Sequence, residues 1–175
     1  MQKTQEQVTM KGNPLLLAGE EVGVGDKAPD FLAVGNDLTP VRFSSLLGQG
    51  KVILLASVPS LDTSVCDLET RRFNTEFGRL GETAIGLTIS MDLPFAQRRW
   101  CGAAGVQNVR TLSDHRQASF GHAYGVLIED LRLLARAVFV IDRAGTVMYK
   151  ELVREVTHEP DYSGAISAVK RLIGQ

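Results

Sequence analysis

The chain has 175 residues, with 19 lysines and arginines against 20 aspartates and glutamates, and 44% of its residues are hydrophobic. The resulting net charge of -1 gives no electrostatic reason to expect a nucleic acid or an anionic membrane as a partner. Because a length near ~150 residues favours one domain with roughly two-thirds of its unfolded surface buried, residues 1–175 are predicted to form a single domain.

Short strands and turns are predicted for the first third of the chain. Residues 8–18 predict two short strands around a turn at Gly12-Asn13, a pair typical of hairpins. Residues 31–34 and 41–43 predict two further short strands, and glycines then interrupt the pattern. The continuous apolar run 52–57 predicts a central strand that is buried on both faces.

The rest of the chain alternates between strands and helices. Strands are predicted at 84–90 and 137–141, and residues 146–151 are predicted to pair with the second of these through the turn 142–145. Helices are predicted at about 65–80, 93–103, 116–124 and 161–173. This alternation indicates an α/β fold with an antiparallel hairpin late in the chain.

The sequence also carries information about the compartment. No stretch approaches the ~18 consecutive apolar residues that a membrane span needs. The segment Met1–Gln7 is polar and lacks the apolar core of a signal peptide, so a cytoplasmic protein is expected. In a reducing compartment, two cysteines are expected to be reactive or inert rather than permanently joined in a disulfide.

The most informative stretch, residues 57–66, directly follows the most apolar strand. Pro59 fixes a turn, and a helix is predicted to begin with Thr63 as its N-cap and Cys66 in its first turn. The Thr63 hydroxyl is then expected to accept a hydrogen bond from the Cys66 amide. The positive end of the helix dipole favours the thiolate, so the pattern predicts a reactive cysteine.

The buried face of this predicted helix includes the same cysteine. Phe73, Phe77 and Leu80 share a helical face with Cys66, so the sulfur is expected to point toward the protein body and to be partly shielded. A free cysteine is often only a small buried hydrophobe. The helix start, the cap residue and the preceding proline argue against that alternative here.

The spacing Pro59-x-x-x-Thr63-x-x-Cys66 resembles the signature of the peroxiredoxins. Four further stretches resemble the bacterial thiol peroxidase branch of that family, whose members are atypical 2-Cys peroxiredoxins: Gly12-Asn13-Pro14, residues 92–102, residues 135–142 and residues 159–162. The resemblance extends from about Val8 to the C-terminus, with Trp100 at a position where phenylalanine is usual. It implies a thioredoxin fold with an added N-terminal hairpin, and a homodimer.

The same resemblance implies a chemistry and assigns residues to it. Cys66 would be the peroxidatic cysteine, which attacks one oxygen of hydrogen peroxide or an alkyl hydroperoxide. Thr63 would hydrogen-bond the sulfur or the peroxide, and Arg136 would supply a fixed cation that favours the thiolate and holds a peroxide oxygen. Pro59 would shield the site.

Cys101 is implied to be the resolving cysteine, which condenses with the Cys66 sulfenic acid to form an intramolecular disulfide. Its helix is predicted to begin with Asp92 as N-cap, to hold Pro94 in its first turn and to end at Gly102. The reduced fold is expected to keep the two Cα atoms beyond the ~7 Å that a disulfide permits, so resolution requires local unwinding. Thioredoxin is the implied reductant.

Two other functions remain open at this level. A general protein disulfide oxidoreductase usually carries a Cys-x-x-Cys motif, whereas 34 residues separate Cys66 from Cys101. A redox-sensing interaction module could use the same pair of cysteines. His115, His122 and His158 share no ligand spacing with either cysteine, so neither a metal nor a cofactor is expected.

Overall fold

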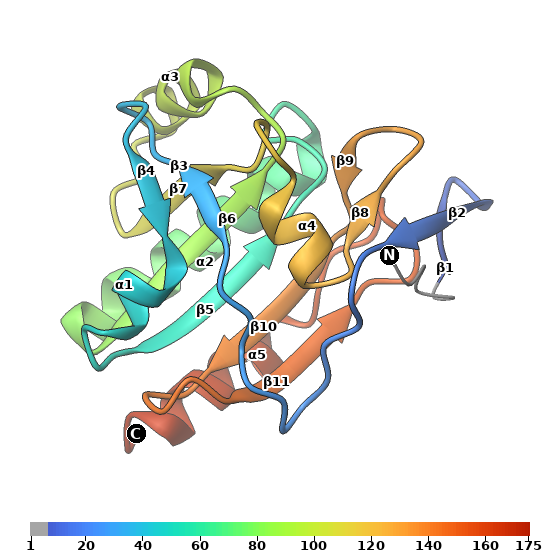
Figure 1. Ribbon diagram of the computed structural model, residues 1–175. Helices are drawn as coiled ribbons and strands as arrows, with labels where there is room; N and C mark the ends of the chain where they lie inside the picture. Colours follow the sequence, from blue (N-terminus) through green and yellow to red (C-terminus); the bar gives the residue numbers. More distant parts are fainter. Residues whose placement is uncertain (1–6) are drawn as a thin grey trace.

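A seven-stranded mixed sheet forms the centre of the computed structural model, which describes residues 7–175 (Figure 1). Across the sheet the strands are β11 (Val147–Leu152), β10 (Ala137–Ile141), β5 (Val52–Ser57), β6 (Ala84–Ser90), β7 (Val109–Ser113), β3 (Leu32–Val34) and β4 (Pro40–Arg42). β6 pairs in parallel with β5 and with β7, whereas the other neighbours are antiparallel. The predicted late hairpin is confirmed as β10–β11.

A second, four-stranded sheet has the order β1 (Gln7–Met10), β2 (Asn13–Ala18), β8 (Leu127–Ile128) and β9 (Leu133–Leu134). It contains the predicted N-terminal hairpin, but the predicted turn at Gly12-Asn13 is wrong by one residue. Lys11 and Gly12 form the turn, because Asn13 already pairs with Met10. Both turn residues have positive φ, 51° and 81°, as a tight type I′ connection requires. Residues 1–6 of the polar segment Met1–Gln7 lie outside the described residues.

Helices cover both faces of the central sheet (Figure 1). In chain order they are α1 (Phe43–Leu47), α2 (Ser64–Leu80), a short 3-10 turn (Gly81–Thr83), α3 (Pro94–Ala104), α4 (Ser119–Ala123) and α5 (Tyr162–Leu172). α2 and α5 pack on one face, and α4 packs on the other. Within the described residues, no helix is long and apolar enough to cross a bilayer.

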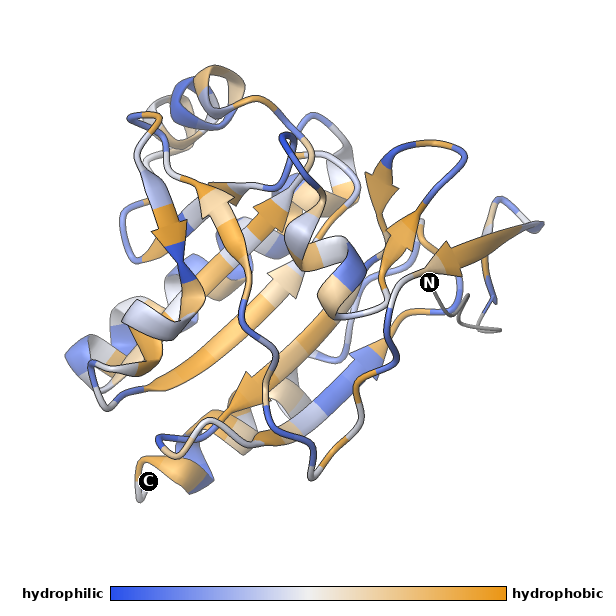
Figure 2. Ribbon diagram, in the orientation of Figure 1, coloured by the Kyte–Doolittle hydropathy of each residue, from blue (hydrophilic) through white to orange (hydrophobic). Residues whose placement is uncertain are grey.

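The alternation of side chains along the buried strands builds these two layers. In β5, Val52, Leu54 and Ala56 belong to the core beneath α2 and α5, whereas Ile53 and Leu55 belong to the core on the opposite face. All six residues of β5 are buried, as predicted for a central strand. Figure 2 shows the same hydrophobic band along β5 and β10, with hydrophilic residues mostly on the outer segments.

Several elements differ from the prediction, and the short elements α1, β8 and β9 are not predicted at all. β7 is not predicted, because its sequence Val-Arg-Thr-Leu-Ser is half polar, yet it lies between β6 and β3 and four of its five residues are buried. α3 begins after Leu93 rather than Asp92, and it continues through Gly102 to Gly105, whose φ of 68° ends it. α4 occupies only part of 116–124.

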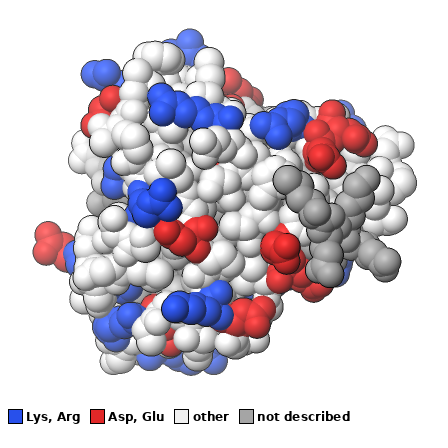
Figure 3. All heavy atoms as spheres, viewed as in Figure 1, with Lys and Arg blue, Asp and Glu red and all other residues white. Residues whose placement is uncertain are grey.

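The molecular surface shows no concentration of one charge on the face that Figure 3 displays. Lysine and arginine side chains alternate there with aspartate and glutamate side chains. This mixed pattern is what the near-zero net charge of the chain leads one to expect.

Candidate active site

The N-terminus of α2 lies just beyond the carboxyl end of β5, and Cys66 is in its first turn. Thr63 is the N-cap residue, as predicted, with extended backbone angles (φ -97°, ψ 146°). The predicted bond from the Cys66 amide to the Thr63 hydroxyl is wrong. Oγ1 of Thr63 instead donates to the Ser60 carbonyl at 2.8 Å, because the turn between these residues brings that oxygen within reach.

The first turn of α2 therefore has no side-chain cap. The first backbone bond of the helix runs from the Asp67 amide to the Thr63 carbonyl at 3.0 Å. The amides of Ser64, Val65 and Cys66 precede this bond and lack intrahelical acceptors. Together with the positive end of the helix dipole, they provide donors for an anion or an oxygen atom near Cys66.

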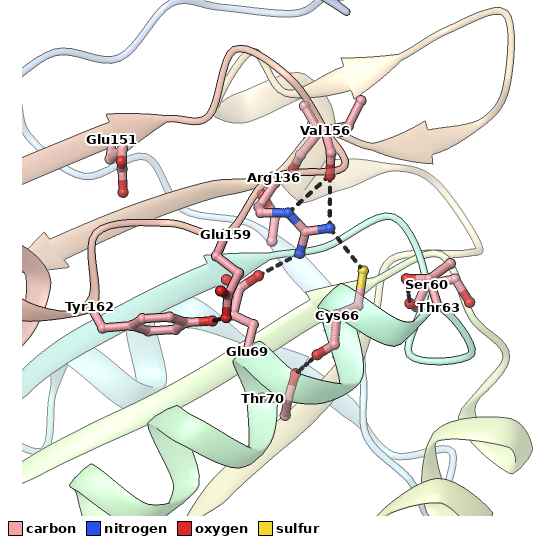
Figure 4. Close-up of polar contacts among 12 residues, drawn as sticks. Ser60, Thr63, Cys66, Glu69, Thr70, Arg136, Glu151, Val156, Glu159 and Tyr162 are labelled. Atoms are coloured by element: carbon pink, nitrogen blue, oxygen red, sulfur yellow. Dashed lines mark hydrogen bonds and ion pairs between the residues drawn. The ribbon is translucent and has the colours of Figure 1, made fainter. Parts of the chain in front are cut away.

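Arg136 contacts the sulfur of Cys66, as Figure 4 shows: its Nη2 atom donates to Sγ at 3.3 Å. The register of the sheet produces this contact. Ala137 pairs with Ser57, so the start of β10 lies beside the end of β5, where the loop to α2 begins. Arg136 directly precedes β10 and is only 2% exposed. Strand pairing thus brings together two residues that are 70 positions apart in the sequence.

The guanidinium of Arg136 is held from two other sides. Nε and Nη2 donate to the Val156 carbonyl at 3.1 and 2.8 Å, and Nη1 donates to Oε2 of Glu69 at 2.5 Å. These bonds fix the plane of the guanidinium, so its charge has one orientation toward the sulfur. Although burial opposes it, the carboxylate of Glu69 raises the pKa of Arg136 and keeps it charged.

Glu69 is a site residue that the sequence interpretation missed. It is fully buried, and its Oε1 atom has no hydrogen-bond partner within the described residues. Burial raises the pKa of Glu69 to about 7, against the opposing effect of the Arg136 cation. A sequence signal existed, because Glu69 follows Cys66 by three residues on the face of the helix that also holds Phe73.

Replacing Glu69 by glutamine is expected to change how stability depends on pH. The pKa of Glu69 is about 7 in the folded chain and about 4.3 in an unfolded chain. At a pH between these two pKa values, the folded chain therefore binds more protons than the unfolded chain. Lowering the pH from about 8 to about 5 should therefore stabilise the wild type relative to Glu69→Gln. Urea denaturation of both reduced proteins measures the difference, and a difference independent of pH would contradict the raised pKa.

A pocket of about 270 Å³ lies beside the first turn of α2. Its lining comes from the N-terminal hairpin, the loop before α2, the α2 N-terminus, the residue before β10 and the segment after β11: Met10, Lys11, Pro59, Thr63, Ser64, Val65, Arg136, Val156 and Thr157. It thus brings together three residues that the resemblance singled out. Pro59 is buried at its edge.

The expected partial shielding of Cys66 is wrong, because its side chain is 0% exposed. Val58, Leu61 and the ring of Trp100 pack with it, and Arg136 covers its sulfur. These neighbours come from other elements of the fold, so the helical pattern alone could not indicate them.

Cys101 lies apart from this cluster, in the last turn of α3. It is half-buried, its Sγ atom is 3.4 Å from Oγ1 of Thr111 in β7, and it lines a different pocket of about 620 Å³. Both cysteines are free thiols. Cys66 faces Arg136, which precedes β10, whereas Cys101 faces Thr111 in β7, and strands β5 and β6 lie between β10 and β7. This arrangement favours the expected local unwinding, which stays a prediction.

Asp92, predicted as a helix cap, has another role. Its carboxylate accepts hydrogen bonds from Oγ of Ser60 (2.7 Å), the amide of Leu61 (2.8 Å) and Oγ of Ser90 (2.7 Å). It therefore ties the loop before α2 to the end of β6. Across residues 7–175, no group of three or more histidine, cysteine, aspartate or glutamate side chains is arranged to hold a metal ion.

The fold and this site define a class of protein: a redox protein in which a buried thiol lies at a helix N-terminus beside a fixed arginine. The Redoxin family model matches residues 23–166. The chain is 56% identical over 163 residues to a thiol peroxidase of Halalkalibacterium halodurans, which covers 93% of this chain and 96% of that protein. It is 52% identical over 167 residues to a thiol peroxidase of Bacillus subtilis, which covers 95% and 98%.

Solved structures agree with these relatives. A peroxiredoxin-like protein from Aquifex aeolicus superposes with a TM-score of 0.87 at 42% identity, over 95% of this chain and 96% of that one. A thiol peroxidase from Chromobacterium violaceum shares the fold with a TM-score of 0.82 at 23% identity, over 97% and 96%. The chain belongs to the redoxin family and, within it, to the thiol peroxidases, which confirms the resemblance in the sequence.

Proposed function

We propose that the chain reduces hydrogen peroxide and organic hydroperoxides, with Cys66 as the peroxidatic cysteine and Cys101 as the resolving cysteine. The observation that carries this proposal is the 3.3 Å contact between Nη2 of Arg136 and Sγ of Cys66 at an uncapped helix N-terminus. Both features favour negative charge on the sulfur, and a thiolate is the nucleophile that peroxide reduction needs.

The first step oxidises the sulfur and reduces the peroxide. The Cys66 thiolate attacks the terminal oxygen of the hydroperoxide, a sulfur–oxygen bond forms and the oxygen–oxygen bond breaks. The second oxygen leaves as an alkoxide or hydroxide and takes a proton from solvent, and Cys66 becomes a sulfenic acid. Arg136 and the amides of Ser64 and Val65 stabilise the charge that develops on the departing oxygen.

Thr63 and Pro59 orient the peroxide in this proposal. Because the Thr63 hydroxyl already donates its proton to Ser60, its oxygen is free to accept the proton of the peroxide O–H group. Pro59 lines the same pocket and offers no backbone N–H to compete for the peroxide. Since Cys66 is fully buried, the side chains between the pocket and the sulfur must part slightly for the attack.

The second step restores the thiol. The Cys101 thiol attacks the sulfenic sulfur of Cys66, water leaves and an intramolecular disulfide forms. A dithiol carrier then reduces the disulfide by exchange, and we propose thioredoxin for this part. A single domain, a homodimer and a cytoplasmic location complete the proposal; the homodimer rests on the family resemblance, and the other two rest on the sequence.

Stopped-flow consumption of hydrogen peroxide and an alkyl hydroperoxide by the reduced protein tests this function. We expect rates far above those of free cysteine. Rates equal to those of free cysteine would overturn the proposal and favour the redox-sensing alternative.

Cys101→Ser is expected to leave the first step intact and to stop turnover. One equivalent of peroxide should be consumed, since Cys66 is unchanged, and the sulfenic acid should accumulate, since no second thiol of the chain can resolve it. Trapping with dimedone and mass spectrometry detects this species. Continued turnover of Cys101→Ser with a dithiol carrier would remove Cys101 from the mechanism.

A further inference from the structure

Two residues that each neighbour a cysteine in the sequence, Asp67 and Trp100, are joined by a hydrogen bond. Trp100 precedes Cys101, and its indole Nε1 donates to Oδ1 of Asp67 at 2.8 Å; Asp67 directly follows Cys66. The Trp100 ring also packs against the small cluster that contains Cys66. The end of α3 therefore covers the start of α2 through the side chain beside the resolving cysteine.

Arg71 reinforces this contact from the next turn of α2. Its Nε donates to the second carboxylate oxygen of Asp67 at 3.0 Å, and its guanidinium carbon lies 5.7 Å from the centroid of the Trp100 ring. Its Nη1 also donates to the carbonyl of Ala104, the last residue of α3, at 3.4 Å. One arginine thus contacts both helices, and it meets α3 at the end where a cation is favoured.

All these contacts lie within about one and a half helical turns of a cysteine. The sulfur of Cys66 faces Arg136, and the sulfur of Cys101 faces Thr111. The predicted local unwinding would take the segments that carry both sulfurs out of their helical positions so that a disulfide can form. Movement of either segment separates Trp100 from Asp67. The cost of breaking these contacts is therefore part of the barrier to disulfide formation.

We propose that Trp100, Asp67 and Arg71, here called the Trp100 cluster, are positioning residues that hold the two cysteine-bearing helices together and set the rate of resolution. This inference rests on the proposed function. A slow resolution step prolongs the life of the Cys66 sulfenic acid. A second hydroperoxide can then convert it to a sulfinic acid, with one more sulfur–oxygen bond formed, one oxygen–oxygen bond broken and an alcohol or water released.

The exposure of the cluster sets the size of the effect. The side chains of Arg71 and Asp67 are 48% and 35% exposed, so solvent weakens their ion pair. The hydrogen bond from the partly buried indole to the carboxylate is the stronger contact. Removing it should accelerate resolution by about fivefold, which corresponds to the loss of about 1 kcal/mol.

Two variants test the cluster, with one matched control. Trp100→Phe keeps an aromatic ring beside Cys66 and removes only the indole donor, and Arg71→Gln removes the exposed cation. Arg98→Ala changes an exposed arginine of α3, the helix that carries Trp100, and is the control. Rapid quenching and mass spectrometry give separate rates for loss of the thiol and for formation of the disulfide.

We expect disulfide formation to be about fivefold faster in Trp100→Phe and about twofold faster in Arg71→Gln, with Arg98→Ala at the wild-type rate. The peroxide concentration that converts half of Cys66 to sulfinic acid should rise by the same factors. The rate of thiol loss should stay unchanged in Arg71→Gln. A role limited to general stability would not change one step and spare the other.

Trp100 also supplies a spectroscopic test, because it is the only tryptophan of the chain. Disulfide formation in the wild type should move its emission to longer wavelengths as the indole leaves the cluster and meets water. Identical emission of the reduced and oxidised wild type would overturn the proposal, as would disulfide formation in Arg71→Gln that is no faster than in the wild type.

The outcomes separate this inference from the proposed function. Variants that react with peroxide but resolve at the wild-type rate refute the cluster and leave the peroxidase intact. A wild type that does not react with peroxide refutes both. Should Trp100→Phe fail to fold, Arg71→Gln decides alone, because the side chain it changes is about half exposed.

Discussion

Replacing Cys66 by serine is expected to abolish peroxide reduction, down to the rate of the uncatalysed reaction. A serine hydroxyl stays protonated at neutral pH and is a far weaker nucleophile than a thiolate, even beside Arg136 and an uncapped helix N-terminus. The expected loss of catalysed reduction is complete rather than partial, because the other sulfur that lines the pocket, the thioether of Met10, cannot ionise to a thiolate. Stopped-flow peroxide consumption measures it.

The fold of Cys66→Ser should persist, because the exchange replaces sulfur by a smaller oxygen that can still accept a hydrogen bond from Arg136. Urea denaturation is the control for folding, and Cys101→Ser, which keeps the first turnover, is the matched control for chemistry. Rapid peroxide consumption by folded Cys66→Ser would make Cys101 the reacting thiol and would contradict the proposed assignment.

Replacing Arg136 by methionine is expected to slow oxidation of Cys66 by about 100-fold, the usual effect of losing one donor at a developing negative charge. At a pH above the raised pKa of Glu69, the same change leaves its buried carboxylate without its cation. Breaking a buried ion pair from one side typically costs about 3–5 kcal/mol, so the variant should also be much less stable to urea.

A double variant separates these two effects. In Arg136→Met with Glu69→Gln, neither buried charge remains, so a large part of the lost stability should return. The oxidation rate of Cys66 should stay low, because no cation faces the sulfur. Recovery of both stability and rate in the double variant would show that Arg136 acts only as the partner of Glu69 and has no part in the chemistry.

Predictions from local sequence patterns are right where a few neighbouring residues decide the structure. The start of α2 at Thr63, the hairpin β10–β11 and the buried strand β5 all agree with the sequence. The ends of α3 are predicted less well, because a leucine can occupy the N-cap position when Asp92 is engaged by the loop before α2. The failure at β7 has a similar cause, since its polar residues are buried by neighbouring strands.

The candidate site divides in the same way. The position of Cys66 at a helix N-terminus follows from the residues around it, whereas Arg136 and Cys101 were predicted as site residues only from the resemblance to a family. Glu69 was predicted neither from local residues nor from the resemblance, although it contacts Arg136 as closely as the cysteine does. Its place on the helix face of Cys66 and Phe73 is the sequence signal for Glu69, and its complete burial is known only from the tertiary structure.

The amino-acid sequence by itself determined the alternating faces of the strands, the start of α2 and the placement of a thiol in its first turn, because these depend on backbone preferences over a few residues. Only the tertiary structure decided that Arg136 meets Cys66 and Glu69, that Thr63 turns toward Ser60 and that Trp100 covers the cysteine. The contacts of Arg136 join residues about 70 positions apart, and the pairing of β10 with β5 sets their geometry. Such contacts depend on how whole elements pack, which no local pattern encodes.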